Sequence, residues 1–305
     1  MKKKLLLISL CCSQLLWSQE TPNEWESGGT SRINFSQLNL TNWSAGGQNS
    51  INANSLISLH ANRKREKSLW ENFLEIGYGI NLQGESESWI KTDDKIDFTS
   101  KYGYVASKKW SYAALFNFKT QFSDGYNYPN DSIKISGLFA PAYILESIGF
   151  DYQTESGFSC YISPATIKIT VVGNQDLSNS GAFGVQPAKL DDLGNIEIEG
   201  ENTRTEFGGY IRAYYKKEIV KNINVNSKVE LFANYLESPL YVDVNWELLL
   251  AFKVKKFISA SLSTQLIYDH DILIDKDNNG DGITDVSEAA TQFKEVFGIG
   301  LAYTF

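Results

Sequence analysis

The stretch "DNNGDGITDVSE" at residues 277–288 has the spacing of a calcium-binding loop. Oxygen-bearing side chains recur through it, and Gly282 falls at the sixth position, where such loops turn sharply. A hard cation such as Ca²⁺ takes about six to eight oxygen ligands, which this pattern can supply. We therefore predict a structural calcium ion held by Asp277, Asn279, Asp281, Ile283 through its carbonyl, Asp285 and Glu288. The alternative is an acidic, glycine-rich loop in solvent, because the flanking residues resemble strands rather than helices.

The two histidines each lie near residues that occur in hydrolase active sites. His270 adjoins Asp269, and a histidine with a carboxylate can activate water. His60 has Ser58 and Asn62 at two-residue spacing, the residue types of a serine hydrolase. Adjacent strand residues point to opposite faces, which separates His270 from Asp269, and serine is common throughout the chain. We predict no enzymatic activity and keep a hydrolase as a third hypothesis, after the two given below.

The segments that would position these residues alternate with a period of two. Residues 110–122, 223–235 and 242–254 place large apolar side chains on one parity and polar side chains on the other. This is the pattern of strands with one wet face, and helical periodicity is almost absent. The segments exceed the usual strand length of about five or six residues and reach the roughly 9–11 that a tilted strand needs to cross a membrane. A soluble β-sandwich, which favours shorter strands, is the alternative.

The fold class predicted is all-β, a transmembrane antiparallel up-and-down β-barrel of about twelve strands. Short, mostly basic turns alternate with longer, more acidic loops, as expected for periplasmic turns and extracellular loops. Alternation slips near Pro141 and Pro164, where bulges are expected. Tryptophans are expected at both membrane rims. The polar parity predicts a lumen lined by Lys119, Lys228, Glu230, Asp243, Asn245 and Glu247.

The start of the chain indicates export. Lys2, Lys3 and Lys4 precede an apolar run that is too short to span a bilayer, and small or polar residues follow. We predict a signal peptide at residues 1–18, a periplasmic lead-in at 19–29 and an outer-membrane barrel at 30–305. Removing the three lysines moves the net charge from −8 to −11, which argues against a nucleic-acid partner. Only Cys160 remains after cleavage, so no internal disulfide can form.

Several segments together resemble a known family. They are the leader, the segment "NWSAGGQNSI" after the first strand, the acidic loop, and the ending "QFKEVFGIGLAYTF". In these the chain resembles the domain of unknown function 3078 family of outer-membrane barrels. The resemblance implies a barrel in the outer membrane of a Gram-negative cell, and it brings no assigned substrate or catalytic residue. The final Phe305 also resembles the terminal signal read by the outer-membrane assembly machinery.

The function predicted is a narrow channel or small-solute uptake pore, whose solute the sequence does not name. A barrel of about twelve strands lies between filled eight-strand barrels and open sixteen-strand porins, which favours a restricted lumen. The runner-up is a closed structural or surface-display barrel, of adhesion type, with a calcium-stiffened extracellular loop. Expected partners are outer-membrane lipid and the assembly machinery. The long connection at 173–203 leaves a plug, a ligand-capturing loop and a simple solvated loop all open.

Overall fold

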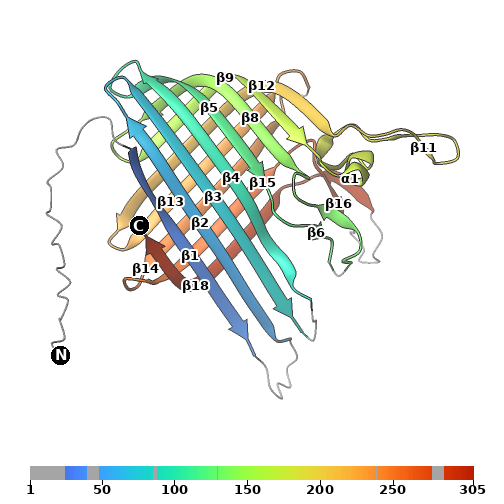
Figure 1. Cartoon of the computed structure of the whole chain (residues 1–305), viewed down its shortest axis with the longest axis horizontal. Helices are drawn as coiled ribbons and strands as arrows, with labels where there is room; N and C mark the ends of the chain where they lie inside the picture. Colours follow the sequence, from blue (N-terminus) through green and yellow to red (C-terminus); the bar gives the residue numbers. More distant parts are fainter. Residues whose placement is uncertain (1–24, 40–47, 85–87, 129, 238, 277–284) are drawn as a thin grey trace, which may run out of the picture.

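The chain forms a closed antiparallel barrel of twelve strands (Figure 1). The computed structural model describes residues 25–39, 48–84, 88–128, 130–237, 239–276 and 285–305. The barrel strands are β1 (Trp25–Leu38), β2 (Ser50–Lys64), β3 (Ser68–Gln83), β4 (Ile90–Val105), β5 (Trp110–Thr120), β8 (Ala142–Gln153), β9 (Phe158–Val171), β12 (Thr203–Val220), β13 (Ile223–Asn234), β14 (Val242–Lys253), β15 (Ile258–Tyr268) and β18 (Gln292–Thr304). The predicted fold class is confirmed.

Closure joins the two ends of the barrel sequence. Strand β18 pairs with β1 in antiparallel register, from Thr30 opposite Thr304 to Phe35 opposite Ile299. The amide of Phe305 donates to the carbonyl of Gly29 at 3.0 Å, so pairing continues to the last residue. A Cβ atom at Gly300 would collide with the carbonyl oxygen of Ile33 on β1, so the small-residue parity of the tail permits this close approach.

Connection length separates the two ends of the barrel. The turns 65–67, 106–109, 154–157, 221–222 and 254–257 lie at one end, here called the short-turn end, together with both chain ends of the barrel (Figure 1). The opposite, long-loop end carries small additional elements. These are β6 (Gly125–Tyr126), β7 (Lys134–Ser136), α1 (Gln175–Asn179), η1 (Ala182–Gly184), β10 (Lys189–Leu190), β11 (Ile196–Ile198), β16 (Leu273–Lys276) and β17 (Val286–Ala289).

The outer wall is apolar and ends in aromatic belts. At the short-turn end, the rings of Trp25 and Trp70 lie 5.3 Å apart and those of Trp110 and Tyr152 lie 5.0 Å apart. Trp89, just before β4, is exposed at the long-loop end. Such belts mark the two interfaces of a membrane. In the described part of the chain, no helix is long and apolar enough to cross a membrane.

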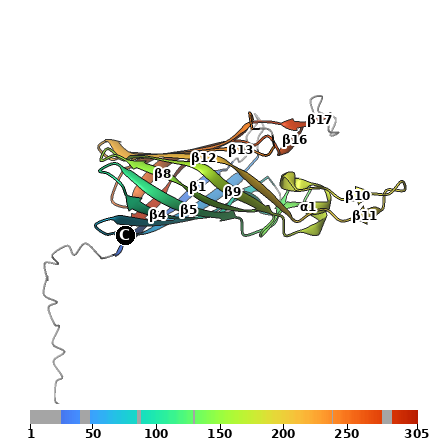
Figure 2. The same cartoon turned by 90° about the horizontal axis from the view of Figure 1, so that it is seen from above.

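The connection between β9 and β12 folds outside the barrel. Leu177 of α1 and Val185 pack with Val172 and Ala140 in a small buried cluster at the barrel mouth. The hairpin of β10 and β11 then extends away from the barrel (Figures 1 and 2). Neither strand of the hairpin enters the lumen, in contrast to the plug that the sequence left open.

Two local details differ from or refine the sequence analysis. Strand β1 begins at Trp25, which pairs with Arg63, so the barrel starts before the expected residue 30. The register of β9 shifts between Ser163 and Thr166, opposite Tyr210 and Gly208. Pro164 lies in this bulge, where it has no ladder hydrogen bond to donate. The proposed signal peptide 1–18 lies outside the described residues, as do residues 19–24 of the lead-in.

Candidate functional site: the barrel lumen

Ion pairs cross the centre of the barrel. Lys95 on β4 contacts Glu75 on the neighbouring β3 and Glu247 on β14, each at 2.8 Å. Strands β4 and β14 lie opposite each other, with five strands between them in either direction around the barrel. Lys228 on β13 also reaches Glu247, at 2.8 Å, and Asp97 on β4, at 3.1 Å. The lumen is therefore bridged across its full width.

A packed polar network fills one side of this bridge. Glu230 is only 6% exposed and is held by Lys119 at 2.5 Å, by the Tyr210 hydroxyl at 2.6 Å and by the Asn245 amide at 3.0 Å. Asp97, 2% exposed, accepts from Asn117 at 2.7 Å. A buried carboxylate is tolerated when cations and donors satisfy it in this way, so this side is closed to solvent by paired charges.

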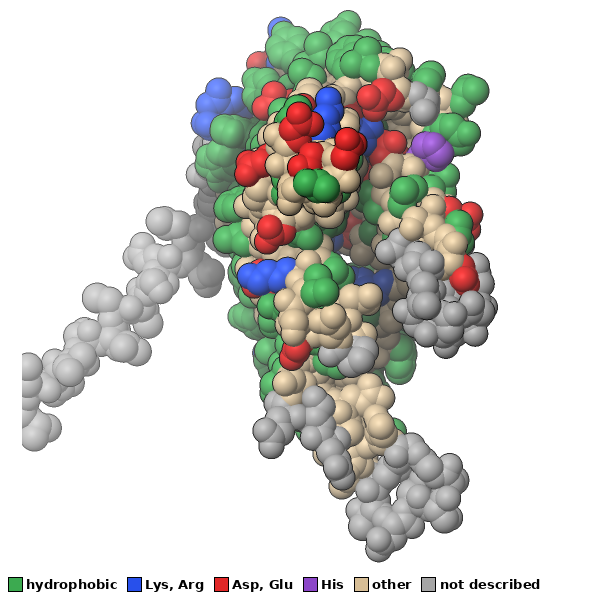
Figure 3. All heavy atoms as spheres, turned by 90° about the vertical axis from the view of Figure 1, so that its right-hand side faces the viewer, with side chains coloured by type: hydrophobic (Ala, Val, Ile, Leu, Met, Phe, Trp, Pro, Cys, Tyr) green, Lys and Arg blue, Asp and Glu red, His purple; other side chains and the backbone are tan. Residues whose placement is uncertain are grey.

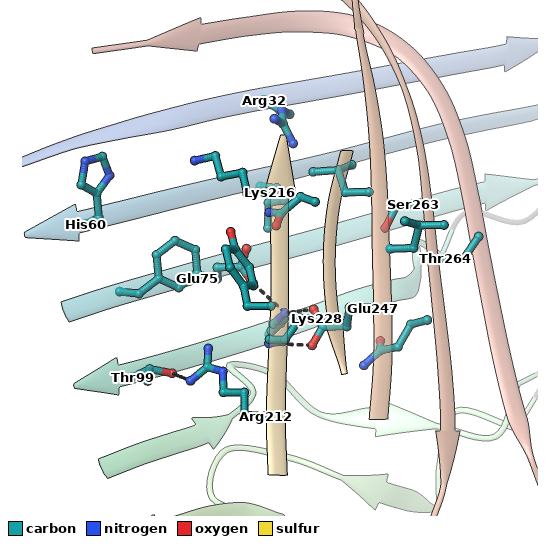
Figure 4. Close-up of a pocket in the computed structure, with 18 of the residues that line it drawn as sticks. Arg32, His60, Glu75, Thr99, Arg212, Lys216, Lys228, Glu247, Ser263 and Thr264 are labelled. Carbon is teal, nitrogen blue, oxygen red and sulfur yellow. Dashed lines mark hydrogen bonds and ion pairs between the residues drawn. The ribbon is translucent and has the colours of Figure 1, made fainter. Parts of the chain in front are cut away.

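A cavity of about 410 Å³ occupies the other side of the bridge (Figure 4). Small polar residues form much of its wall on β1, β2 and β15, including Asn34, Asn54 and Ser261, which are joined by hydrogen bonds. Its lining extends from Asn62, near the short-turn end of β2, to Lys294, near the long-loop end of β18. The cavity thus follows the barrel wall for most of the strand length.

The structure places all six residues predicted to line the lumen on the inner face, but not all on the cavity. Lys228 and Glu247 line it. Lys119, Glu230 and Asn245 belong to the packed network beside it. Asp243 lies nearer the long-loop end, where it pairs with Lys168 at 2.8 Å. Strand parity identifies the inner face, but which inner residues pack and which stay open depends on side chains from opposite strands.

Several charged residues of the site were not singled out in the sequence. They are Arg32 on β1, Lys95 and Asp97 on β4, and Arg212 and Lys216 on β12. Their parity was a usable signal, because Tyr210, Arg212, Tyr214 and Lys216 alternate with apolar residues along β12. The sequence did not indicate which side chains contact one another across the barrel. Arg212, for example, donates a hydrogen bond to the Thr99 hydroxyl on β4 at 3.2 Å.

The long-loop end is rich in acidic side chains (Figure 3). Arg204, near the start of β12, pairs there with Asp271 at 2.7 Å and with Glu237 at 2.9 Å, which ties the strand to two connections. Lys294 pairs with Asp93 at 2.7 Å, joining β18 to β4 at the outer limit of the cavity. The Arg204–Asp271 and Lys294–Asp93 pairs each link elements that are far apart in sequence.

The residues considered for hydrolysis have other contacts. The His270 ring stacks on Tyr241 with centroids 3.8 Å apart. Its neighbour Asp269 forms an ion pair with Lys168 at 3.7 Å. His60 and Asn62 line the lumen cavity rather than the lipid-facing wall.

The predicted calcium ligands are only partly placed. Asp277, Asn279, Asp281 and Ile283 lie outside the described residues. Asp285 precedes β17 and Glu288 lies within it, opposite Ile274 of β16. Among the residues with described positions, no group of three or more histidine, cysteine or acidic side chains is placed to hold a metal ion. The calcium site stays a prediction.

The fold and the lumen together define the class of protein. A closed antiparallel barrel with a polar interior, an apolar wall and aromatic belts is the architecture of outer-membrane β-barrel proteins, and the chain is a protein of this class. Residues 35–126 match the family described as Protein of unknown function (DUF3078), which confirms the resemblance over that segment, less than a third of the chain. No curated protein matches the chain.

Solved structures with a similar chain path are also outer-membrane barrels. The NanC porin is 9% identical, over 90% of this chain and 98% of that one, with a TM-score of 0.37. The translocator domain of the autotransporter NalP from Neisseria meningitidis is 10% identical, over 95% and 91%, with a TM-score of 0.38. OmpT of Vibrio cholerae is 8% identical, over 94% and 99%, with a TM-score of 0.32. Because these identities and TM-scores are low, the fold is established by the strand pairing of the chain itself and not by its similarity to these structures.

Proposed function

We propose that the barrel is a narrow pore for small polar solutes in the outer membrane. The observation that carries this proposal is the cavity, whose lining runs from Asn62 near one end of the barrel to Lys294 near the other. Its polar wall suits hydrated solutes, and its volume of about 410 Å³ falls in the range of small-molecule sites. The solute passes beside the central bridge rather than through the packed network.

The central bridge sets the size limit of the proposed pore. Lys95, Glu247 and Lys228 form one wall of the cavity at mid-barrel, and their charges are held in place by the ion pairs described above. The opposing wall is built from short side chains such as Asn34 and Ser261. This arrangement supports a fixed, narrow opening rather than the wide channel of a sixteen-strand porin.

Single-channel recording of the refolded barrel in a planar bilayer tests the proposal. We expect small, discrete current steps from protein whose folded state is verified by heat-dependent gel mobility. Ser261→Gln places a longer side chain in the cavity and should lower the conductance. Ser259→Gln, on the same strand but outside the cavity lining, should lower it much less. Folded protein that gives no current would overturn the pore.

A second candidate is a closed barrel for structure or surface display. The ion pairs that span the lumen favour it, because they bridge opposite strands and stiffen the barrel. The sequence adds the calcium loop at 277–288, which would stiffen one extracellular connection. A silent bilayer, together with a calcium-dependent rise in thermal stability that Glu288→Ala abolishes, would favour this candidate over the pore.

The proposal includes export, assembly and the lack of catalysis. The predicted leader at 1–18 and the terminal Phe305, whose backbone closes the barrel seam, support delivery to the assembly machinery. Deleting Phe305 should reduce the amount of folded barrel in the outer membrane, whereas Phe305→Trp should not. The stacking of His270 on Tyr241 supports a structural role for this histidine, and His270→Ala should leave any measured hydrolase background unchanged.

A further inference from the structure

The charges that line the lumen cavity are not balanced. Seven cationic side chains line it, from Arg32, Lys95, Lys101, Arg212, Lys216, Lys228 and Lys294, against five carboxylates. The chain as a whole carries a formal net charge of −8. The side chains on the cavity surface therefore carry two more positive than negative charges, although Lys228 and Arg212 also pair with Asp97 and Glu230 behind the lining.

Every carboxylate on the cavity already contacts a lysine. Glu71 and Asp151 both pair with Lys101, at 2.9 and 2.8 Å. The other three are Glu75 and Glu247, each bound to Lys95 at 2.8 Å, and Asp93, bound to Lys294 at 2.7 Å. Each cavity carboxylate is therefore engaged with a lysine of the barrel, which favours anions over cations as the preferred cargo.

Two of the cavity cations have no such partner. Arg32 on β1 and Lys216 on β12 make no side-chain hydrogen bond or ion pair with any residue whose position is described. Glu75 acts on Arg32 electrostatically, but its two carboxylate oxygens are taken by Lys95 at 2.8 Å and by Ser58 at 3.3 Å. A partly buried guanidinium without a counter-charge is costly, and a bound anion relieves that cost.

The surroundings of these two cations add further hydrogen-bond donors. Tyr214 precedes Lys216 by two residues on the same inner face of β12, and Asn226 lies opposite Lys216 on β13. Arg32 approaches the same cavity from β1 (Figure 4). A guanidinium binds planar or tetrahedral oxyanions through two parallel hydrogen bonds, and an ammonium adds a point charge.

We propose that Arg32 and Lys216 form an anion-binding subsite in the lumen and that the preferred solutes are small oxyanions, carrying a carboxylate or a phosphate group. The proposal rests on the pore function in so far as it names the cargo, while the subsite itself needs only the cavity. An anion displaces no existing ion pair when it binds there, because both cations are free to receive it.

The first test measures ion selectivity in a planar bilayer under a KCl gradient. We expect a reversal potential that shows preference for chloride, and current that phosphate or succinate reduces. Arg32→Gln and Lys216→Gln should each shift the reversal potential toward zero and weaken the block about tenfold or more, as expected for the loss of a charged hydrogen bond. Lys217→Gln removes the same charge from the opposite face of β12 and should change neither.

The second test separates the subsite from the pore. Binding of radiolabelled phosphate and of succinate to the detergent-folded barrel is measured for the wild type and the three variants. If the bilayer is silent but binding occurs and is lost in Arg32→Gln, the pore fails and the subsite stands. Conducting channels without anion preference, or binding of neither probe, overturn the anion subsite. If phosphate binds more tightly than succinate, the preferred solutes carry a phosphate group; if succinate binds more tightly, they carry a carboxylate.

Discussion

Lys95 on β4 and Glu247 on β14 meet at 2.8 Å from strands that lie opposite each other around the barrel. Their contact divides the lumen into a packed network on one side and an open cavity on the other. Side chains from facing walls can meet only if both are long, so a Lys–Glu pair suits this span. In the proposed pore, this contact limits the width of the passage.

Breaking the ion pairs of Lys95 should raise the conductance and lower the stability of the barrel. Lys95→Ala removes the side chain that spans the lumen and leaves Glu75 and Glu247 with fewer partners. We expect larger current steps together with lower stability against urea in lipid vesicles. A double-mutant cycle with Glu247→Ala should show a coupling energy of about 0.5–3 kcal/mol. Strictly additive effects would mean that the pair does not interact in the membrane.

Lys228 should be the most sensitive lysine of the lumen. It is 7% exposed and lies between Asp97 and Glu247, so Lys228→Met leaves the buried Asp97 carboxylate without its lysine, while Glu247 keeps Lys95. Breaking such a pair from one side costs about 3–5 kcal/mol. Lys216→Met is the matched control, since Lys216 is exposed and has no ion pair among the described residues. Equal unfolding midpoints for the two variants would contradict the network.

Glu146 lies on the lipid-facing wall, where its carboxylate should make the barrel less stable than an apolar side chain would. It is an exposed residue within β8, opposite Phe116 on β5 and Ile167 on β9, and its neighbours of the same parity are Ile144 and Ile148. A carboxylate on the lipid face is unfavourable near mid-membrane. We expect Glu146→Leu to stabilise the barrel by about 1–2 kcal/mol in vesicle unfolding.

The control for this change is Glu199→Leu, in the β11–β12 connection outside the barrel wall, which should leave the free energy of unfolding unchanged. A loss of stability in Glu146→Leu would show instead that the carboxylate has a favourable contact in the membrane.

Gly300 should be required for closure. A Cβ at this position would meet the carbonyl oxygen of Ile33 on β1, at the seam that joins the ends of the barrel. Gly300→Ala should therefore slow folding and reduce the folded fraction on a heat-modifiability gel. Gly77→Ala, where the nearest atom to an added Cβ is 3.5 Å away, should behave almost as the wild type.

The alternation along the chain is enough to predict the barrel and the inner face of its strands. Alternation over more than ten residues requires one wet and one apolar face, so Lys119, Lys228, Glu230, Asp243, Asn245 and Glu247 could be assigned to the interior from parity alone. Turn and loop lengths likewise follow from where the alternation stops. The bulge at Pro164 was indicated by a break in that alternation.

Which inner residues meet depends instead on how the strands close into a barrel. Lys95 and Glu247 are 152 residues apart in sequence, and their contact depends on how far the strands are staggered around the closed barrel. That stagger is fixed by hydrogen-bond register over all twelve strands, which no local pattern encodes. For the same reason parity could not tell a paired lysine such as Lys228 from an unpaired cation such as Arg32, although the open cavity and its charge depend on that difference.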